Sequence, residues 1–136
     1  MSKTLSDFVA AARERVDEIS ADDLQEALEE GEDLLLVDIR EPYEYEKAHI
    51  PGALLIPRGM LEGAADPNNP HRIEALYSAR ERPVVMVCNT GGRAAMAADT
   101  LMQMGFGQVR SLAGGLKMWE AEDYDIESGT YAGPLP

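Results

Sequence analysis

Residues 84–93 read Val-Val-Met-Val-Cys-Asn-Thr-Gly-Gly-Arg, and they carry the clearest structural signal in the chain. The unbroken apolar run over residues 84–87 is typical of a strand that is buried on both faces of a parallel sheet. After the two glycines, apolar residues recur at helical spacing, so we expect a helix over residues 93–104. The stretch therefore predicts a buried strand, a short loop and a helix in direct succession.

Further strands and helices alternate on both sides of this unit. Residues 34–37 form a second apolar run that ends at Asp38, and 109–112 form a third, shorter one. This alternation predicts an α/β fold with a mostly parallel sheet. The other elements that we expect are short strands at 18–20 and 53–56, and helices at 4–15, 21–30, 42–47, 73–79 and 116–120, with a loop of at most one helical turn at 59–71.

The chain has 136 residues, which fits one domain with its own hydrophobic core. We expect an N-terminal helical extension over residues 1–15 and the folded domain over residues 16–122. Residues 123–136 contain glycine and proline without an apolar pattern, so we interpret them as a C-terminal tail.

The composition excludes several classes of protein. With 25 acidic and 12 basic residues the formal charge is −13, so we expect no binding to nucleic acid, which needs a broad basic surface. The central segment between Arg72 and Lys117 is mildly basic, with six basic and three acidic residues, and it is the part of the chain that would attract a small anion.

The cysteine count and the hydropathy of the chain indicate the cell compartment in which we expect the protein. The single cysteine, Cys88, rules out an intrachain disulfide and a zinc site built from several thiolates. We find no apolar run of the ~20 residues that a membrane helix needs, and no secretory signal at the start of the sequence. We therefore expect a cytoplasmic protein that contacts neither membrane nor nucleic acid, and we leave its oligomeric state open.

Three predicted strand ends should meet at one edge of the sheet, where parallel α/β sheets bind ligands. These ends are residues 38–40, residues 88–93 and residues 113–115. Glycines allow successive backbone N–H groups to turn inward, and a helix that starts at once adds partial positive charge. Cys88 with the loop after it therefore forms a cradle for a sulfur anion or an oxyanion, although a lone cysteine can also be a buried structural residue.

Three ordered motifs extend over the chain from about Ile19 to Trp119. They are residues 38–45 with 49–53, residues 88–93, and residues 105–106 with Val109, 112–116 and Trp119. With these motifs the sequence resembles the rhodanese family of sulfurtransferases. Ala48 departs from the pattern, since the family more often has glycine before the histidine of the first motif.

The resemblance implies a five-stranded parallel sheet flanked by helices, with Cys88 as the nucleophile and no metal or cofactor. The thiolate would take a sulfane sulfur from a small anionic donor such as thiosulfate and become a persulfide. The acceptor would be cyanide or a thiol, and a sulfur-relay protein is a further possible partner. The active-site loop that would bind the substrate consists of Asn89, Thr90, Gly91, Gly92 and Arg93.

Several polar residues allow two interpretations. Asp38 and Arg40 either line the pocket or form a structural ion pair that supports the Cys88 loop. Arg58 follows a short strand and either helps to bind an anionic donor or is a surface arginine. His49 precedes Ile-Pro-Gly, which favours a hydrogen-bonded turn over a general base. Arg93 would either attract the anion or lock the loop through an acidic side chain.

Two other functions compete with catalysis of sulfur transfer. Cysteine-dependent phosphatases and arsenate reductases also place a cysteine and an arginine on a loop at a helix N-terminus, but five residues separate the pair there and four separate it here. The second alternative is a non-catalytic or slow rhodanese module that serves as a sulfur carrier, a sensor or a protein-binding domain. Its retained cysteine weighs against an inactive form.

Overall fold

A five-stranded parallel sheet runs through the centre of the computed structural model, which describes all 136 residues. The strand order is β1-β5-β4-β2-β3, and every neighbouring pair is parallel. This confirms the expected α/β fold and makes the sheet parallel throughout. The strands are β1 (Asp17–Ile19), β2 (Leu35–Asp38), β3 (Leu54–Leu55), β4 (Val84–Val87) and β5 (Val109–Leu112).

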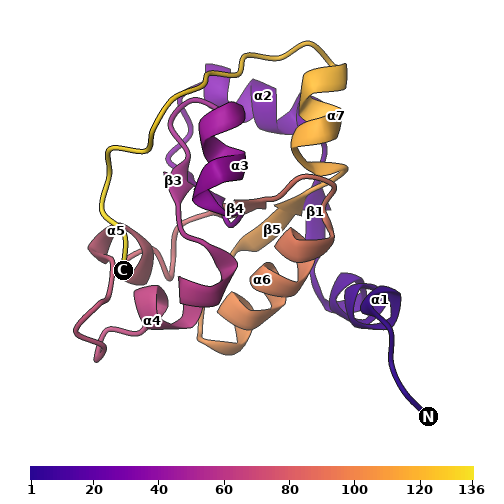
Figure 1. Ribbon diagram of the computed structural model, residues 1–136, viewed down its shortest axis with the longest axis vertical. Coiled ribbons are helices and arrows are strands. Elements are labelled where there is room, and N and C mark those ends of the chain that lie inside the picture. Colours follow the sequence, from indigo (N-terminus) through magenta and orange to yellow (C-terminus); the bar gives the residue numbers. More distant parts are fainter.

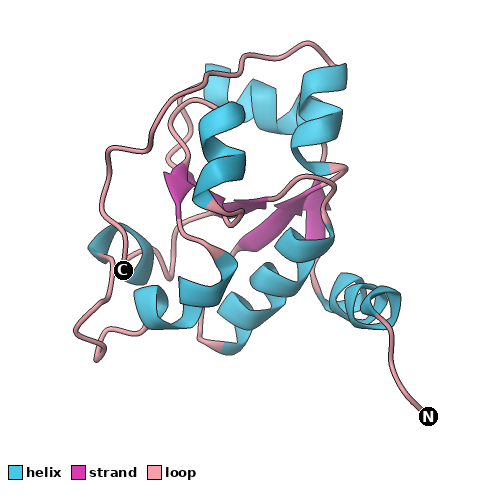
Figure 2. Ribbon diagram, viewed as in Figure 1, coloured by secondary structure: helices cyan, strands magenta, loops and turns pink.

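Helices cover both faces of the sheet (Figures 1 and 2). One face carries α2 (Ala21–Glu29), α3 (Pro42–Lys47) and α7 (Gly115–Ala121). The other face carries the short 3₁₀ turn η1 (Arg58–Met60), α4 (Leu61–Ala65), α5 (Glu74–Tyr77) and α6 (Gly92–Gln103), and α1 (Leu5–Arg15) packs beside α6. None of these helices has the length and apolar character that crossing a membrane requires.

The central strand β4 explains why its sequence is apolar without interruption. Val85 and Val87 pack into the core beneath α2, α3 and α7. Val84, Met86 and Cys88 point to the opposite face and join the core beneath α4, α5 and α6. Because successive side chains of a strand alternate between the faces, a strand with helices on both sides needs apolar residues at every position.

Helix α1 differs from a simple core helix. Thr4 and Asp7 cap it reciprocally, and Ala12 is buried against the domain. However, Leu5 is 69% exposed and Phe8 is 53% exposed, so half of its apolar stripe faces away from the protein. The helix lies at the border of the helical layer and packs against α6.

Residues 58–65 are more helical than we expected. The sequence indicated a loop with at most one turn at 59–71, whereas η1 runs directly into α4. Leu61, Ala64 and Ala65 of α4 are fully buried under the sheet. Burial of these side chains stabilises the helix despite Gly63, which illustrates how tertiary packing overrides weak local propensity. Strand β3 covers Leu54–Leu55 and is shorter than the expected 53–56, although Ile56 and Arg58 still donate backbone hydrogen bonds to Asp38 and Ile39.

The segment after α7 packs against the domain rather than leaving it. His49 and Glu127 exchange two backbone hydrogen bonds of 2.9 Å, and the Gly129 N–H donates to the Glu46 carbonyl. The ring of Tyr131 meets that of Tyr45 edge-on, with centroids 5.4 Å apart. Single backbone contacts of this kind leave no periodic pattern in a sequence, so the interpretation of residues 123–136 as an unpatterned tail missed them.

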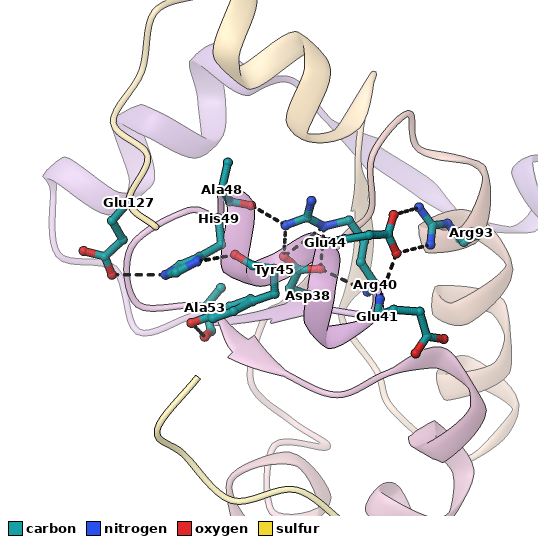
Figure 3. Close-up of polar contacts among 10 residues, drawn as sticks. All are labelled: Asp38, Arg40, Glu41, Glu44, Tyr45, Ala48, His49, Ala53, Arg93 and Glu127. Carbon is teal, nitrogen blue, oxygen red and sulfur yellow. Dashed lines mark hydrogen bonds and ion pairs between the residues drawn. The ribbon is translucent and has the colours of Figure 1, made fainter. Parts of the chain in front are cut away.

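A buried ion pair fixes the end of β2 (Figure 3). Arg40 donates from Nε and Nη2 to both carboxylate oxygens of Asp38, and its Nη2 also donates to the Ala48 carbonyl at 2.7 Å. The side chains of Asp38 and Arg40 are 1% and 4% exposed. Of the two roles considered for these residues, the geometry fits the structural ion pair.

We expect Arg40→Met to lower the free energy of unfolding by about 3–5 kcal/mol, because the Asp38 carboxylate would stay buried without its partner. The matched control is Arg58→Met, which removes a part-exposed pair with Glu62 and should cost about 1 kcal/mol or less. Urea unfolding at neutral pH measures both values. Equal, small losses in the two variants would contradict a structural role for the buried pair.

Candidate active site

Cys88 stands at the carboxyl end of β4, at the entrance to the loop that leads into α6. Its side chain is buried, with only 1% of the residue exposed. The Sγ atom accepts two backbone hydrogen bonds, from the Gly91 N–H at 3.0 Å and from the Ala94 N–H at 3.3 Å. Backbone N–H groups aimed at the sulfur in this way can stabilise negative charge that develops there during a reaction.

The loop can wrap around the sulfur because Gly91 adopts a backbone conformation that other residues avoid. Its φ angle is +104°, and it is the N-cap of α6. This turn aims the start of the helix at Sγ, so the positive end of the helix dipole meets the sulfur. The N–H groups of Gly92 and Arg93 donate to no acceptor within the protein. They are free to bind a second sulfur atom or an anion beside Cys88.

The carbonyl side of the loop is held by α7. Leu116 N–H donates to the Cys88 carbonyl at 2.8 Å, and Lys117 N–H donates to the Asn89 carbonyl at 3.0 Å. Gly115, directly before Leu116, has a φ of +61°, and a Cβ there would stand 2.5 Å from both carbonyl oxygens. The expected meeting of the strand ends after β4 and β5 is therefore observed, and a glycine permits the close approach.

Arg93 is bound to Glu44 of α3 by two parallel hydrogen bonds of 2.9 Å (Figure 3). The hydrogen bond from Arg93 lowers the pKa of Glu44 to about 2, with smaller contributions from the Glu41 N–H and from Arg40. The same contact raises the pKa of Arg93. Arg93 thus locks the loop to α3, one of the two roles that we considered for it. Glu44 was missed as a site residue, because nothing in its local sequence indicates a partner 49 positions away.

Of the other residues predicted for the site, two lie in the loop and Arg58 lies outside it. Asn89 and Thr90 are exposed at the tip of the loop. Arg58 bonds to Glu62 and to Thr100 of α6. Thr100 is seven residues past Arg93, or about 10 Å along the helix, so Arg58 belongs to a different region from the loop.

His49 occupies a structural position away from the loop. Its Nδ1 lies 2.7 Å from the Tyr45 carbonyl, and its ring stacks on the Tyr45 ring with centroids 3.6 Å apart. Its Nε2 is 3.4 Å from a carboxylate oxygen of Glu127 (Figure 3). These contacts match the hydrogen-bonded turn that the sequence favoured.

We expect Gly115→Ala to lower the free energy of unfolding by about 2–4 kcal/mol and to speed alkylation of Cys88, because the added methyl forces α7 away and loosens the loop around the buried thiol. Gly52→Ala is the matched control. Gly52 also has a positive φ, +85°, but a Cβ there meets nothing within 4 Å, so only about 1 kcal/mol of backbone strain should appear. Thermal unfolding and the rate of iodoacetamide labelling test the pair. Similar values for both variants would disprove the steric argument.

The Glu44–Arg93 pair gives the stability a defined pH dependence. Because folding lowers the Glu44 pKa from 4.5 to about 2, the stabilisation is complete above pH 4.5 and disappears as the pH falls towards 2. Since the pair is partly exposed, we expect wild type to exceed Glu44→Gln by only about 1–2 kcal/mol at pH 7. Urea unfolding of both proteins from pH 3 to pH 7 measures the difference. A gap that stays constant down to pH 3 would contradict this assignment.

The chain is similar to proteins that are named for sulfur transfer or sulfur carriage. A sulfurtransferase of Allochromatium vinosum is 38% identical over 104 residues, which cover 76% of this chain and 88% of that protein. The putative sulfur carrier protein YrkF of Bacillus subtilis is 35% identical over 104 residues, which cover 76% of this chain and 51% of that longer protein.

A solved structure from Rhodopseudomonas palustris, described as a protein of unknown function and possible tyrosine phosphatase, superposes with a TM-score of 0.87. It is 29% identical, and the alignment covers 93% of this chain and 96% of that one. The sequence model of the rhodanese-like domain family matches residues 20–122 of this chain. The chain belongs to the rhodanese-like domain family.

Proposed function

We propose that this protein transfers sulfane sulfur through a persulfide on Cys88. The observation that carries the proposal is the buried Sγ with two N–H donors, beside two further N–H groups that have no protein acceptor. A site of this shape stabilises a negative charge first on the cysteine sulfur and, after sulfur transfer, on the terminal sulfur bonded to it. Relatives named sulfurtransferases support a general role in sulfur transfer.

The first half of the proposed reaction loads the cysteine. With thiosulfate as donor, the Cys88 thiolate attacks the outer sulfur, a new S–S bond forms, and the bond to the sulfonate sulfur breaks. Sulfite leaves with the bonding electron pair, and the persulfide keeps one negative charge on its terminal sulfur. The N–H groups of Gly92 and Arg93 support the proposal, because they are free to stabilise that terminal sulfur.

The second half discharges the sulfur to an external acceptor. Cyanide or a thiolate attacks the terminal sulfur, the S–S bond breaks, and Cys88 regains its thiolate. With cyanide the product is thiocyanate. The chain contains no second cysteine to resolve the persulfide internally, so the sulfur must leave to another molecule. We propose small thiols or a sulfur-relay protein as the physiological acceptors.

The length of the loop favours this reaction over phosphate ester hydrolysis, which the description of the Rhodopseudomonas palustris structure raises. Four residues separate Cys88 from Arg93, whereas phosphatases of the type considered above have five. The shorter loop encloses a smaller space. In addition, both terminal nitrogens of Arg93 bond to Glu44, which leaves the loop without a free arginine of its own for a phosphate group.

A sulfur-carrier role is the second candidate, and the likeness to the putative carrier YrkF favours it. A carrier would load one sulfur and hold it until a specific protein removes it. The burial of Cys88 suits that role, because a persulfide at a buried position is protected from small nucleophiles.

Intact-protein mass spectrometry after incubation with thiosulfate is the direct test. Wild type should gain one sulfur atom, and Cys88→Ser should gain none while it keeps the same far-UV circular dichroism. Steady thiocyanate production on addition of cyanide identifies an enzyme, whereas a loaded protein that cyanide discharges slowly identifies a carrier. Efficient hydrolysis of an aryl phosphate without any persulfide would refute both proposals.

A further inference from the structure

Helix α1 reaches the Cys88 loop from outside the part of the chain that matches the family. It lies beside α6 (Figure 1), and Val9 and Arg13 come close to the two loop glycines. Cγ2 of Val9 is 3.3 Å from the point where a Cβ at Gly92 would stand. Nη2 of Arg13 is 3.4 Å from the corresponding point at Gly91. Because the Gly91 N–H donates to Sγ, Arg13 contacts a residue that itself touches the sulfur.

An ion pair two residues further along holds this helix in place. Arg15 donates from Nε and Nη2 to the two carboxylate oxygens of Asp99 on α6, at 2.8 and 2.7 Å. The carboxylate of Asp99 is largely buried, and the hydrogen bond from Arg15 lowers its pKa. This ion pair therefore holds the part of α1 that carries Arg13 next to the loop.

Arg13 differs from the other arginines near the loop because it has no carboxylate oxygen within hydrogen-bond distance. Its nearest carboxylate oxygen, on Glu18, is 4.0 Å away, both side chains are nearly half exposed, and the guanidinium makes no hydrogen bond within the protein. Three other arginines near the loop each have a carboxylate oxygen within 3.0 Å: Arg15 with Asp99, Arg40 with Asp38, and Arg93 with Glu44.

We propose that Arg13 is the donor-binding residue of this site. Its guanidinium holds the charged end of an anionic sulfane donor, such as the sulfonate oxygens of thiosulfate, while the outer sulfur reaches Cys88. A planar guanidinium can donate two parallel hydrogen bonds to such a group. The proposal rests on the proposed function for the identity of the donor, but not for the presence of an anion subsite beside Cys88.

Lys117 is the other cation beside the loop, and the contacts favour Arg13 over it. Lys117 is exposed on α7, and it meets the loop only through its backbone N–H, which donates to the Asn89 carbonyl. Its ammonium makes no ion pair and no hydrogen bond within the protein. Arg13 instead places its charged group against Gly91. Lys117→Gln therefore serves as a control, because it also removes one positive charge near the loop, but from α7 instead of α1.

The first test compares two alkylating reagents of nearly equal size, anionic iodoacetate and neutral iodoacetamide, on Cys88. The quantity measured is the ratio of the two labelling rates, iodoacetate over iodoacetamide. We expect Arg13→Gln to lower this ratio about tenfold, the value of one charge-assisted hydrogen bond. Arg13→Lys should keep most of the ratio, and Lys117→Gln should leave it within twofold of wild type. An unchanged ratio in Arg13→Gln overturns the proposal, as does a larger loss in Lys117→Gln.

The second test measures persulfide formation from thiosulfate by rapid quenching and mass spectrometry. Arg13→Gln should lower the second-order rate constant of loading about tenfold, while discharge of the preformed persulfide by a neutral thiol stays within twofold. Equal loading rates in wild type and Arg13→Gln overturn the donor-binding role. If wild type takes no sulfur from thiosulfate but the alkylation ratio still depends on Arg13, the proposed function fails and the anion subsite stands.

Discussion

The buried pair of Asp38 and Arg40 ties the sheet to the helices around the candidate site. Removing two charges from water is costly, and such a pair is stable only if further hydrogen bonds satisfy the remaining donors. Arg40 meets this condition by bonding to both oxygens of Asp38 and to the Ala48 carbonyl at the end of α3. Helix α3 in turn carries Glu44, which binds Arg93 in the first turn of α6. The end of β2 and the start of α6 are thus linked by a continuous chain of charged contacts.

This arrangement leaves the Cys88 loop little freedom. The carbonyls of Cys88 and Asn89 accept hydrogen bonds from α7, the sulfur accepts two from the start of α6, and Arg93 anchors the loop to α3. The bonds come from elements that are far apart in the sequence and packed on both faces of the sheet. A nucleophile held in this way needs little reorganisation when charge moves along an S–S bond, which is the condition for electrostatic stabilisation of the reaction.

The sequence predicts structure that depends on neighbouring residues, but it does not predict contacts between residues that are far apart in the chain. The apolar run of β4 and the glycines after it predict the strand, the loop and the start of α6, because each depends on neighbouring residues. The pairing of Glu44 with Arg93 and the contact of Arg13 with Gly91 join positions that are 49 and 78 residues apart. No periodicity encodes such contacts, and they follow only from the folded arrangement of α1, α3 and α6. For the same reason the short helix α4 was underestimated, since its stability comes from burial of Leu61 and Ala64.

The strongly acidic composition is compatible with an anionic substrate because charge acts over a limited range. At physiological ionic strength exposed charges are screened beyond about 8 Å, so the formal charge of −13 matters less at Cys88 than the groups next to it. Two of these groups, the Asp38–Arg40 and Glu44–Arg93 pairs, are close to neutral as units. The arginine nearest to Cys88 in the sequence is therefore a structural link. On our proposal, the positive potential at the sulfur comes instead from the N-terminus of α6 and from Arg13, which α1 brings next to the loop.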